Sequence, residues 1–178
     1  LRAGGREALV YNLSAIDWGT GQELLALREL GTAAAPDAVV LFLYPANDLV
    51  NNSPLLAQST SVSAGDLIRP YVRAADGELR VEYLSPWCAW LRRHSRLFAS
   101  FERRSLAGRG GLRVVEDYAE RLRRGSAPRE DLEIFRSHAD SRDRWRQAWE
   151  TSFALLRTVH RDCEAMGARL LVVVVPSV

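Results

Sequence analysis

The first third of the chain combines continuous apolar runs with apolar residues at helical spacing. Ala8–Asn12 is a short apolar run that ends in polar residues, which predicts a strand. A helix is predicted after the glycines of Gly19–Gly21, ending near Gly31, because leucines recur at helical spacing, at Leu24, Leu27 and Leu30. Ala38–Tyr44 is a second apolar run and predicts a second strand.

A strand, a helix and a strand in this order, with short links, predict parallel strands joined by a right-handed crossover. In such sheets, ligands bind beyond the carboxyl ends of the strands. The loops expected at that edge are Ser14–Gly21 and Pro45–Asn52. Polar residues in these two loops are therefore the first candidates for a functional role.

The middle of the chain departs from this alternation. Leu67–Arg73 and Glu78–Leu84 alternate around Asp76-Gly77, which predicts a hairpin. After Pro86, an amphipathic helix is predicted, with apolar residues at helical spacing and three arginines off that face. The apolar residues are Trp87, Trp90, Leu91, Leu97, Phe98 and Phe101, and the arginines are Arg92, Arg93 and Arg96.

Two further elements are predicted at the end of the chain, after a segment rich in Arg and Gly (Arg103–Arg129) that we interpret as a surface insertion. An apolar stripe from Trp145 to Met166 predicts a helix of about six turns, which should end at Gly167. Arg169–Val178 is an apolar, β-branched run that predicts a buried parallel strand.

A parallel strand normally continues into a loop and a helix, and the chain begins without Met. We therefore expect both ends to be internal to a longer polypeptide. Residues 1–178 would then be the central part of a single domain, with residues 52–140 as an insertion.

Composition and charge exclude several classes of protein. The chain has 178 residues, 47% of them hydrophobic, which suffices for one domain with a buried core. Its 24 basic residues are all Arg and its acidic residues number 22, so the formal charge is only +2 and a strongly basic nucleic-acid binder is excluded. Cys88 and Cys163 fit no metal or redox motif, so no cofactor is predicted. No apolar stretch reaches the ~18 residues of a membrane span, and the start lacks a signal-peptide core.

Asn47 is the strongest local candidate, because it begins an Asn-Asp pair directly after a predicted strand. A side-chain amide at that place can donate a hydrogen bond to the negative oxygen that develops during acyl transfer. Loss of one such donor costs on the order of 10²–10³ in rate. The alternative is that Asn47 and Asp48 only form a turn or an Asx cap.

Two segments together resemble the second and third conserved blocks of the SGNH hydrolases, also called GDSL-type esterases. The first is Tyr11-Asn12-Leu13-Ser14 followed by Trp18-Gly19-Thr20-Gly21-Gln22-Glu23-Leu24-Leu25. The second is Asp37-Ala38-Val39-Val40-Leu41 followed by Pro45-Ala46-Asn47-Asp48-Leu49. The segments Trp90–Leu97 and Leu170–Pro176 are similar to a bacterial branch with a long insertion after the third block. The resemblance covers nearly the whole chain.

The resemblance implies an α/β fold of three layers, α/β/α and flavodoxin-like, with a parallel sheet and a hairpin and helical insertion. It also implies hydrolysis of an acyl or acetyl ester by Ser, His and Asp. In the family, the oxyanion is held by the Ser amide, a block-two Gly amide and the side chain of the block-three Asn. The Asn maps onto Asn47. The block-two Gly aligns with Asp17, and Gly19 offers an alternative amide; Pro45 or Ala46 stands where a Gly usually precedes the Asn.

The catalytic Ser, Asp and His of the family have no counterparts in the sequence. Gly65-Asp66-Leu67 lacks the Ser and follows the Asn block, and none of the three histidines has an Asp three residues before it. We expect the Ser to precede Leu1 and the Asp and His to follow Val178, so residues 1–178 alone should be inactive. The implied substrate is a small-molecule or carbohydrate ester, with no cofactor and no nucleic acid. Export or a membrane tether in a preceding N-terminal part would fit the family.

Two alternatives to the hydrolase stay open. An acidic residue at the Gly position, Asp17, fits a non-catalytic relative that binds a carbohydrate or a protein. A polysaccharide O-acetyltransferase would use the same catalytic triad and cannot be separated from the hydrolase by these residues.

The other chemistry-bearing residues favour structural interpretations. His94 and His160 lie in apolar stripes and are expected to be packed. His160, Cys163 and Glu164 could present metal ligands on one helix face, but no second ligand pair accompanies them, so no metal is predicted. The Arg pairs could bind an anionic polysaccharide or a membrane surface, although a solvated face is the simpler interpretation. These pairs are Arg92-Arg93, Arg103-Arg104 and Arg123-Arg124, and His138-Ala139-Asp140 is interpreted as solvated surface too.

Overall fold

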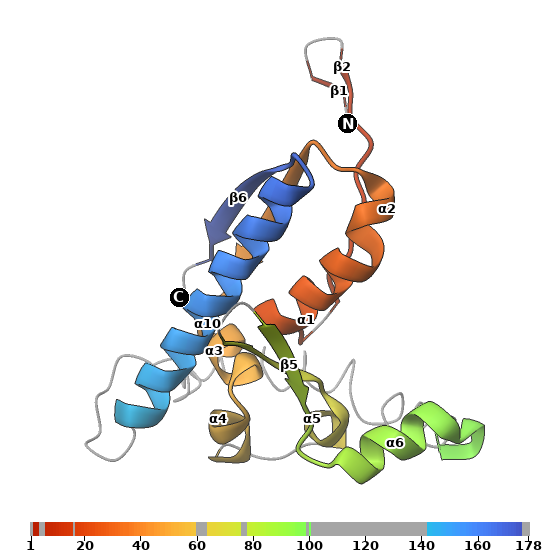
Figure 1. Cartoon of the computed structure of the whole chain (residues 1–178), viewed down its shortest axis with the longest axis vertical. Coiled ribbons are helices and arrows are strands. Elements are labelled where there is room, and N and C mark those ends of the chain that lie inside the picture. The colour runs from red at the N-terminus through yellow and green to blue at the C-terminus, as the bar shows by residue number, and fades with distance from the viewer. Residues whose placement is uncertain are drawn as a thin grey trace, which may run out of the picture.

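The computed structural model describes residues 2–3, 6–15, 17–59, 64–75, 78–98, 100 and 142–175. These residues form an α/β structure with a two-stranded parallel sheet, two short antiparallel hairpins and several helices (Figure 1). The first hairpin, β1 (Arg2–Ala3) with β2 (Arg6–Glu7), lies away from the rest of the chain in both ribbon views. The mixed α/β class predicted from the sequence is confirmed.

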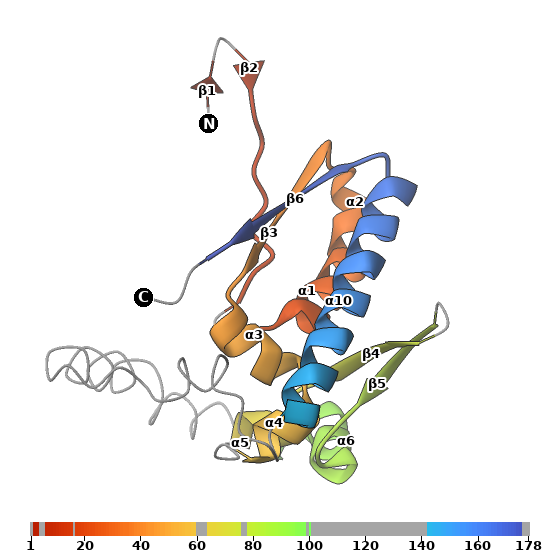
Figure 2. The same ribbon diagram turned by 90° about the vertical axis from the view of Figure 1, so that its left-hand side faces the viewer.

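The parallel sheet consists of β3 (Ala38–Leu43) and β6 (Arg169–Val174), with Ala38 opposite Arg169 and Leu43 opposite Val174. Figure 2 shows the helices α1, α2 and α10 on the same side of this sheet. The outward face leaves large apolar side chains exposed, among them Val40, Phe42 and Leu171. The last strand is therefore parallel as predicted, but the prediction that it is buried is wrong, because the described helices cover only one face.

The helical layer comes from two distant parts of the chain. α1 (Thr20–Ala26) continues through a π-helical turn (Leu27–Gly31) into α2 (Thr32–Ala34), so this helix does not end at Gly31 as predicted. The predicted long helix is confirmed as α10 (Arg142–Ala165), and Gly167 follows it with a φ of 71° that favours glycine. Between these helices and the sheet lies the main apolar core, which includes Leu24, Leu27, Leu41, Val72, Leu155, Val159 and Cys163.

The predicted strand Ala8–Asn12 does not form: residues 8–15 are neither strand nor helix. Leu9, Val10 and Tyr11 are exposed. A strand needs a neighbour whose backbone takes its hydrogen bonds. Within the described part of the chain, β3 instead pairs in parallel with β6. The predicted crossover pair of strands is therefore replaced by a pair formed from β3 and the distant β6.

A second correction concerns Pro45–Asn52, which was predicted as a loop and forms the helix α3. Pro45 suits the first helical turn, where its missing N–H group costs nothing. α4 (Pro54–Ser59) and α5 (Ala64–Ile68) follow, and α3, α4 and α10 share a smaller apolar cluster of Leu49, Leu56 and Ala148. The sheet thus leads directly into a helix at the edge where ligands were expected.

The predicted hairpin is confirmed as β4 (Tyr71–Ala75) and β5 (Glu78–Glu82), although it begins later than predicted because residues 64–68 are helical. The predicted amphipathic helix is α6 (Pro86–His94), which ends at Ser95; residues 96–98 are helical again. The Arg- and Gly-rich segment, Arg103–Arg129, lies outside the described residues. Among the described helices, none is both long and apolar enough to cross a membrane.

Candidate functional site

The loop before α1 is fixed by the side chain of Gln22, which accepts a hydrogen bond from the backbone of the N-cap residue. Gly19 is the N-cap residue, and its N–H donates to the Oε1 atom of Gln22 at 2.8 Å. The Nε2 atom of Gln22 donates to the carbonyl oxygen of Pro70 at 2.5 Å, in the segment that leads into β4. Gln22 therefore holds the start of α1 and joins it to the hairpin.

Asn52 joins three helices at the same place. Its Oδ1 atom accepts a hydrogen bond from the N–H of Gly21 at 3.0 Å, and its Nδ2 atom donates to the hydroxyl of Ser152 on α10 at 3.0 Å. α1 approaches α3 so closely that a Cβ atom on Gly19 would lie 2.8 Å from Asn52 Oδ1 and 2.9 Å from the Cβ atom of Asn51. Glycine is required at position 19 because of this close approach.

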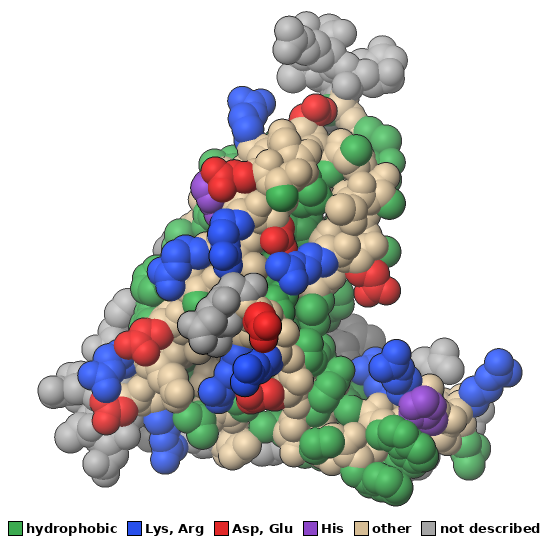
Figure 3. All heavy atoms as spheres, viewed as in Figure 1, with side chains coloured by type: hydrophobic (Ala, Val, Ile, Leu, Met, Phe, Trp, Pro, Cys, Tyr) green, Lys and Arg blue, Asp and Glu red, His purple; other side chains and the backbone are tan. Residues whose placement is uncertain are grey.

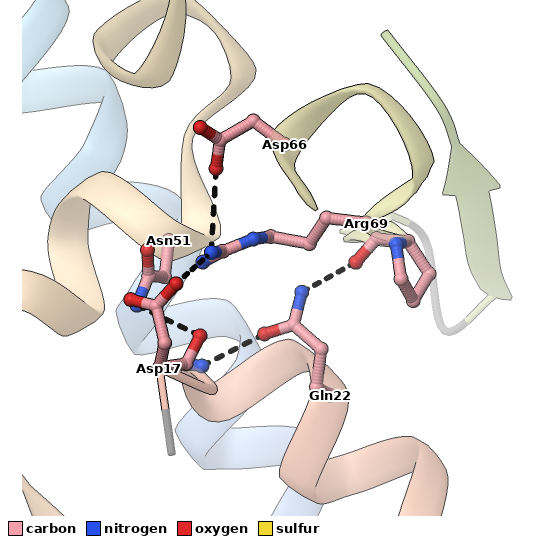
Figure 4. Close-up of polar contacts among 7 residues, drawn as sticks. Asp17, Gln22, Asn51, Asp66 and Arg69 are labelled. Atoms are coloured by element: carbon pink, nitrogen blue, oxygen red, sulfur yellow. Dashed lines mark hydrogen bonds and ion pairs between the residues drawn. The ribbon is translucent and has the colours of Figure 1, made fainter. Parts of the chain in front are cut away.

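Asp17 is the residue that the resemblance aligns with a glycine, and its backbone has a φ of 65°. Three contacts surround it (Figure 4): Asn51 Nδ2 lies 3.2 Å from its carbonyl oxygen and 3.3 Å from its Oδ1 atom, and Arg69 Nη2 lies 2.5 Å from its Oδ2 atom. The left-handed region is uncommon for residues other than glycine. The contacts with Asn51 and Arg69 hold Asp17 in it.

Arg69 is the centre of this arrangement. Its side chain is only 9% exposed and lies between the carboxylates of Asp17 and Asp66, the latter at 3.3 Å (Figure 4). The neighbouring Tyr71 hydroxyl is buried and has no hydrogen-bond partner among the described residues. Burial, with a smaller contribution from Asp66, raises its pKa to about 12. We call the connected residues Asp17, Gln22, Asn51, Asn52 and Arg69 the polar junction.

Asn47 and Asp48 at the start of α3 have different surroundings. The carboxylate of Asp48 is buried and accepts a hydrogen bond from the N–H of Tyr44 at 2.6 Å, which fixes the turn from β3 into α3. The side chain of Asn47 makes no hydrogen bond with any described residue, and its Oδ1 atom is buried without a partner. Asp48 therefore has the capping role considered for the pair, and the side-chain amide of Asn47 has no such role.

Asn47 lies on the same side of α3 as Asp17. Asn47 and Asn51 are four residues apart in one helix, so their side chains share a face, and Asn51 contacts Asp17. The two candidate backbone amides differ, because the N–H of Gly19 is already bonded to Gln22. The N–H of Asp17 donates no hydrogen bond to another described residue. Asp17 and Asn47 thus bring an unpaired main-chain donor and an unpaired side-chain amide to one face.

No family model, curated protein or solved structure matches this chain. The assignment of a function therefore depends on the residues of the site and on the resemblance of the two sequence segments.

Glu23 of α1 and Asp48 of α3 carry carboxyl groups whose charges interact. Burial, and secondarily the charge of Asp48, raises the pKa of Glu23 to about 7. Burial also raises the pKa of Asp48 to about 6, although the hydrogen bond from Tyr44 opposes the shift. Among the described residues, the Oε2 atom of Glu23 is buried without a hydrogen-bond partner. Below a pH of about 7, burial therefore favours the protonated form of Glu23.

The histidines do not have the packed positions predicted for them. His94 is exposed, and its ring lies tilted by 38° against that of Trp90, with ring centroids 5.0 Å apart. His160 is also exposed, and its Nδ1 atom lies 3.4 Å from a carboxylate oxygen of Glu164. Cys163, by contrast, is buried in the main core. The side chains of His160, Cys163 and Glu164 therefore do not converge on one metal site.

Across the described ranges, no group of three His, Cys, Asp or Glu side chains is arranged to hold a metal ion. His138 and Asp140 lie outside the described residues, as do the pairs Arg103-Arg104 and Arg123-Arg124.

Most of the polar junction could not be predicted from the sequence. Nothing in the local pattern singles out Arg69, which is 52 residues from Asp17, or Ser152, which is 100 residues from Asn52. A signal existed for Asn51, because it follows Asn47 at the spacing that places both side chains on one helix face. That signal was hidden because the segment was interpreted as a loop.

Proposed function

We propose that residues 1–178 form the central part of a serine ester hydrolase of the SGNH type, acting on an acyl or acetyl ester. In this proposal, the side-chain amide of Asn47 and the N–H of Asp17 donate to the oxyanion of the tetrahedral intermediate. The observation that carries the proposal is the side-chain amide of Asn47, which makes no hydrogen bond with a described residue and lies in the helix after β3, on the face that contacts Asp17. An unpaired donor aimed at developing charge is what such catalysis needs.

The backbone at Asp17 supports the alignment with the block-two glycine. A φ of 65° lies in the region that glycine adopts readily, and Asp and Asn are the residues that tolerate it next best. The amide needed at this position comes from the backbone, so a side chain is compatible with the role. Gly19 is the weaker alternative because its N–H is already bonded to Gln22.

An acidic side chain next to an oxyanion would oppose catalysis by charge repulsion unless it is neutralised. Arg69 supplies the opposite charge at Asp17 Oδ2, and Asn51 donates to Asp17 Oδ1. These contacts hold the carboxylate against α3 and Arg69. In the proposed mechanism, Arg69 is therefore a positioning residue, which keeps the N–H of Asp17 available.

The finer features of the fold are part of the same proposal. In a flavodoxin-like fold of three layers, a further helical layer would cover the outward face of β3 and β6, and that face is apolar and exposed here. The Ser would come from sequence before residue 1, and the Asp and His from sequence after residue 178. Within residues 1–178, the oxyanion donors are the contribution to catalysis.

The test uses the gene product that contains residues 1–178 with its natural flanking sequence. Hydrolysis of p-nitrophenyl acetate and labelling by a fluorophosphonate probe are measured for the wild type and for Asn47→Ala and Asp17→Gly variants. We expect Asn47→Ala to lower kcat by about 10²–10³ with little change in KM. Asp17→Gly should retain most of the turnover, because it keeps the backbone N–H and the φ that glycine favours.

The outcomes distinguish the esterase from the two alternative functions. Probe labelling of a serine, with Asn47→Ala turning over as fast as the wild type, would remove Asn47 from the mechanism. Absence of both turnover and labelling would favour the non-catalytic alternative that binds a carbohydrate or a protein. Transfer of the acetyl group to an added sugar in preference to water would identify an O-acetyltransferase.

A further inference from the structure

The apolar stripe of α6 faces solvent. Trp87 is 66% exposed and Trp90 is 50% exposed, and their rings stack with centroids 5.1 Å apart and planes 16° from parallel. No residue of α6 is buried. Leu97, in the helical residues that follow, is 83% exposed. An amphipathic helix normally turns such a stripe toward the core, so this arrangement requires an explanation.

α6 is anchored at its start. The Ser85 hydroxyl caps the helix by accepting from the N–H of Cys88 at 3.3 Å, and the N–H of Ser85 donates to the carbonyl oxygen of Leu67 in α5 at 3.1 Å. Beyond this anchor, α6 extends away from the sheet and α10 (Figure 1). The stripe is thus held in a fixed position on a projecting helix.

Charge on this helix is of one sign. The last turn of α6 carries Arg92, Arg93 and His94, Arg96 follows, and residues 83–98 contain no Asp or Glu. Figure 3 shows the two kinds of side chain on different sides of α6, with the arginines above it and hydrophobic side chains along its lower edge. An apolar edge beside a basic one, with tryptophan in the apolar edge, is typical of helices that lie in a membrane interface.

We propose that α6 docks on the surface of an anionic lipid bilayer. Trp87, Trp90 and Leu97 enter the interface between headgroups and acyl chains, and Arg93 and Arg96 pair with lipid phosphates. The helix lies on the bilayer and does not cross it, since α6 has only nine residues. This proposal is independent of the esterase mechanism, because none of these residues belongs to the polar junction.

Two other binding partners for α6 fit the observations less well than a bilayer does. A second copy of the chain would bring identical arginines together, which opposes association. A soluble acidic polysaccharide would pair with the arginines, but it offers no hydrocarbon phase for Leu97. An anionic bilayer satisfies both the charge and the apolar edge.

The test is co-sedimentation of the 178-residue protein with vesicles of phosphatidylcholine alone and of phosphatidylcholine mixed with phosphatidylglycerol. We expect binding to the mixed vesicles that weakens as salt is raised. The Trp87→Ala/Trp90→Ala and Arg93→Gln/Arg96→Gln double variants should each bind the mixed vesicles at least about tenfold more weakly than the wild type. Arg144→Gln/Arg157→Gln removes the same charge from exposed positions of α10 and should bind like the wild type.

Insertion is tested with lipids brominated on the acyl chains, which quench nearby tryptophan fluorescence. Quenching in the wild type that is largely absent in Trp87→Phe/Trp90→Phe is the expected result. The proposal is overturned if the mixed vesicles do not bind the protein, if the two α10 substitutions weaken binding as much as the α6 ones, or if binding occurs without quenching. Dimers that dissociate when Trp87 and Trp90 are replaced would likewise overturn it, in favour of a second copy as the occupant.

Discussion

The polar junction and α6 depart from the usual distribution of side chains in opposite directions. The junction buries polar groups, with Arg69 almost enclosed between two carboxylates, whereas α6 exposes two tryptophans. Most polar atoms of the junction have partners on other elements, so it fastens α1, α3, α10 and the hairpin together. The tryptophans of α6 stack on each other. The difference indicates that the junction serves the stability of the fold and that α6 serves contact with a partner.

Replacing Arg69 with Met should have the largest effect on the free energy of unfolding, a loss of about 3 kcal/mol. The substitution removes a nearly buried charge from between Asp17 and Asp66 and leaves the less exposed Asp66 without this partner. The matched control is Arg73→Met, because Arg73 pairs with Glu82 at 3.3 Å and both side chains are exposed. The control should lose less than about 1 kcal/mol. Urea denaturation followed by circular dichroism measures both, and equal losses would remove the distinction between the junction and a surface ion pair.

Two asparagines of α3 give the next comparison. Asn52→Ala should cost about 2 kcal/mol, because it leaves the buried N–H of Gly21 and the hydroxyl of Ser152 without their partner. Asn47→Ala should change the free energy of unfolding by less than about 0.5 kcal/mol, because its side chain has no hydrogen bond to lose. The same denaturation experiment tests the pair. A large loss in Asn47→Ala would show that Asn47 is a structural residue.

The pH dependence of stability tests the effect of burial on the carboxyl group of Glu23. The folded-state pKa of Glu23 is raised to about 7 from its ordinary 4.5, so the folded protein binds more protons than the unfolded chain between these values. The stabilising contribution is complete below pH 4.5 and is lost as the pH rises through 7. Glu23→Gln should therefore be more stable than the wild type at pH 8, by about 1–2 kcal/mol after allowance for solvent screening, with little difference at pH 4. Glu29→Gln, at an exposed position in the next turn of the helix, is the control.

The smallest effect is expected at α6. Replacing Trp87 and Trp90 together with Ala should change the free energy of unfolding by less than about 1 kcal/mol, despite the removal of two large side chains, because both are exposed in the folded protein. Thermal unfolding followed by circular dichroism measures this change. A loss of several kcal/mol would mean that the tryptophans support the fold and would weaken the contrast with the junction.

The elements with the strongest sequence periodicity were predicted correctly. α10 and β3 follow from long apolar patterns, and the hairpin follows from Asp76-Gly77. The strand predicted at Ala8–Asn12 failed because strand formation depends on a partner, which a local pattern does not supply. The prediction of a loop at Pro45–Asn52 was wrong for a different reason. Its polar residues suggested a loop, but Pro45 suits a first helical turn and Asp48 fixes the entry into it.

For the site, the sequence pointed to Asn47 through its place after a strand and to Asp17 through the family resemblance, and their role as oxyanion donors stays a prediction. It could not predict the residues that hold them. Arg69, Asn52 and Ser152 acquire their roles from contacts between elements that are 31 to 100 residues apart. Tertiary contacts of this kind leave no periodic trace in a single sequence.

The burial of Arg69 also limits the order in which substitutions can be accepted during evolution. Its side chain is only 9% exposed and pairs with Asp17 and Asp66, whereas Asp17 is 62% exposed and is solvated without it. Removing the partners of a buried charge is costly, so the carboxylates are replaced more easily after position 69 has become uncharged. The less exposed member of the pair, position 69, therefore sets the order in which the two positions change.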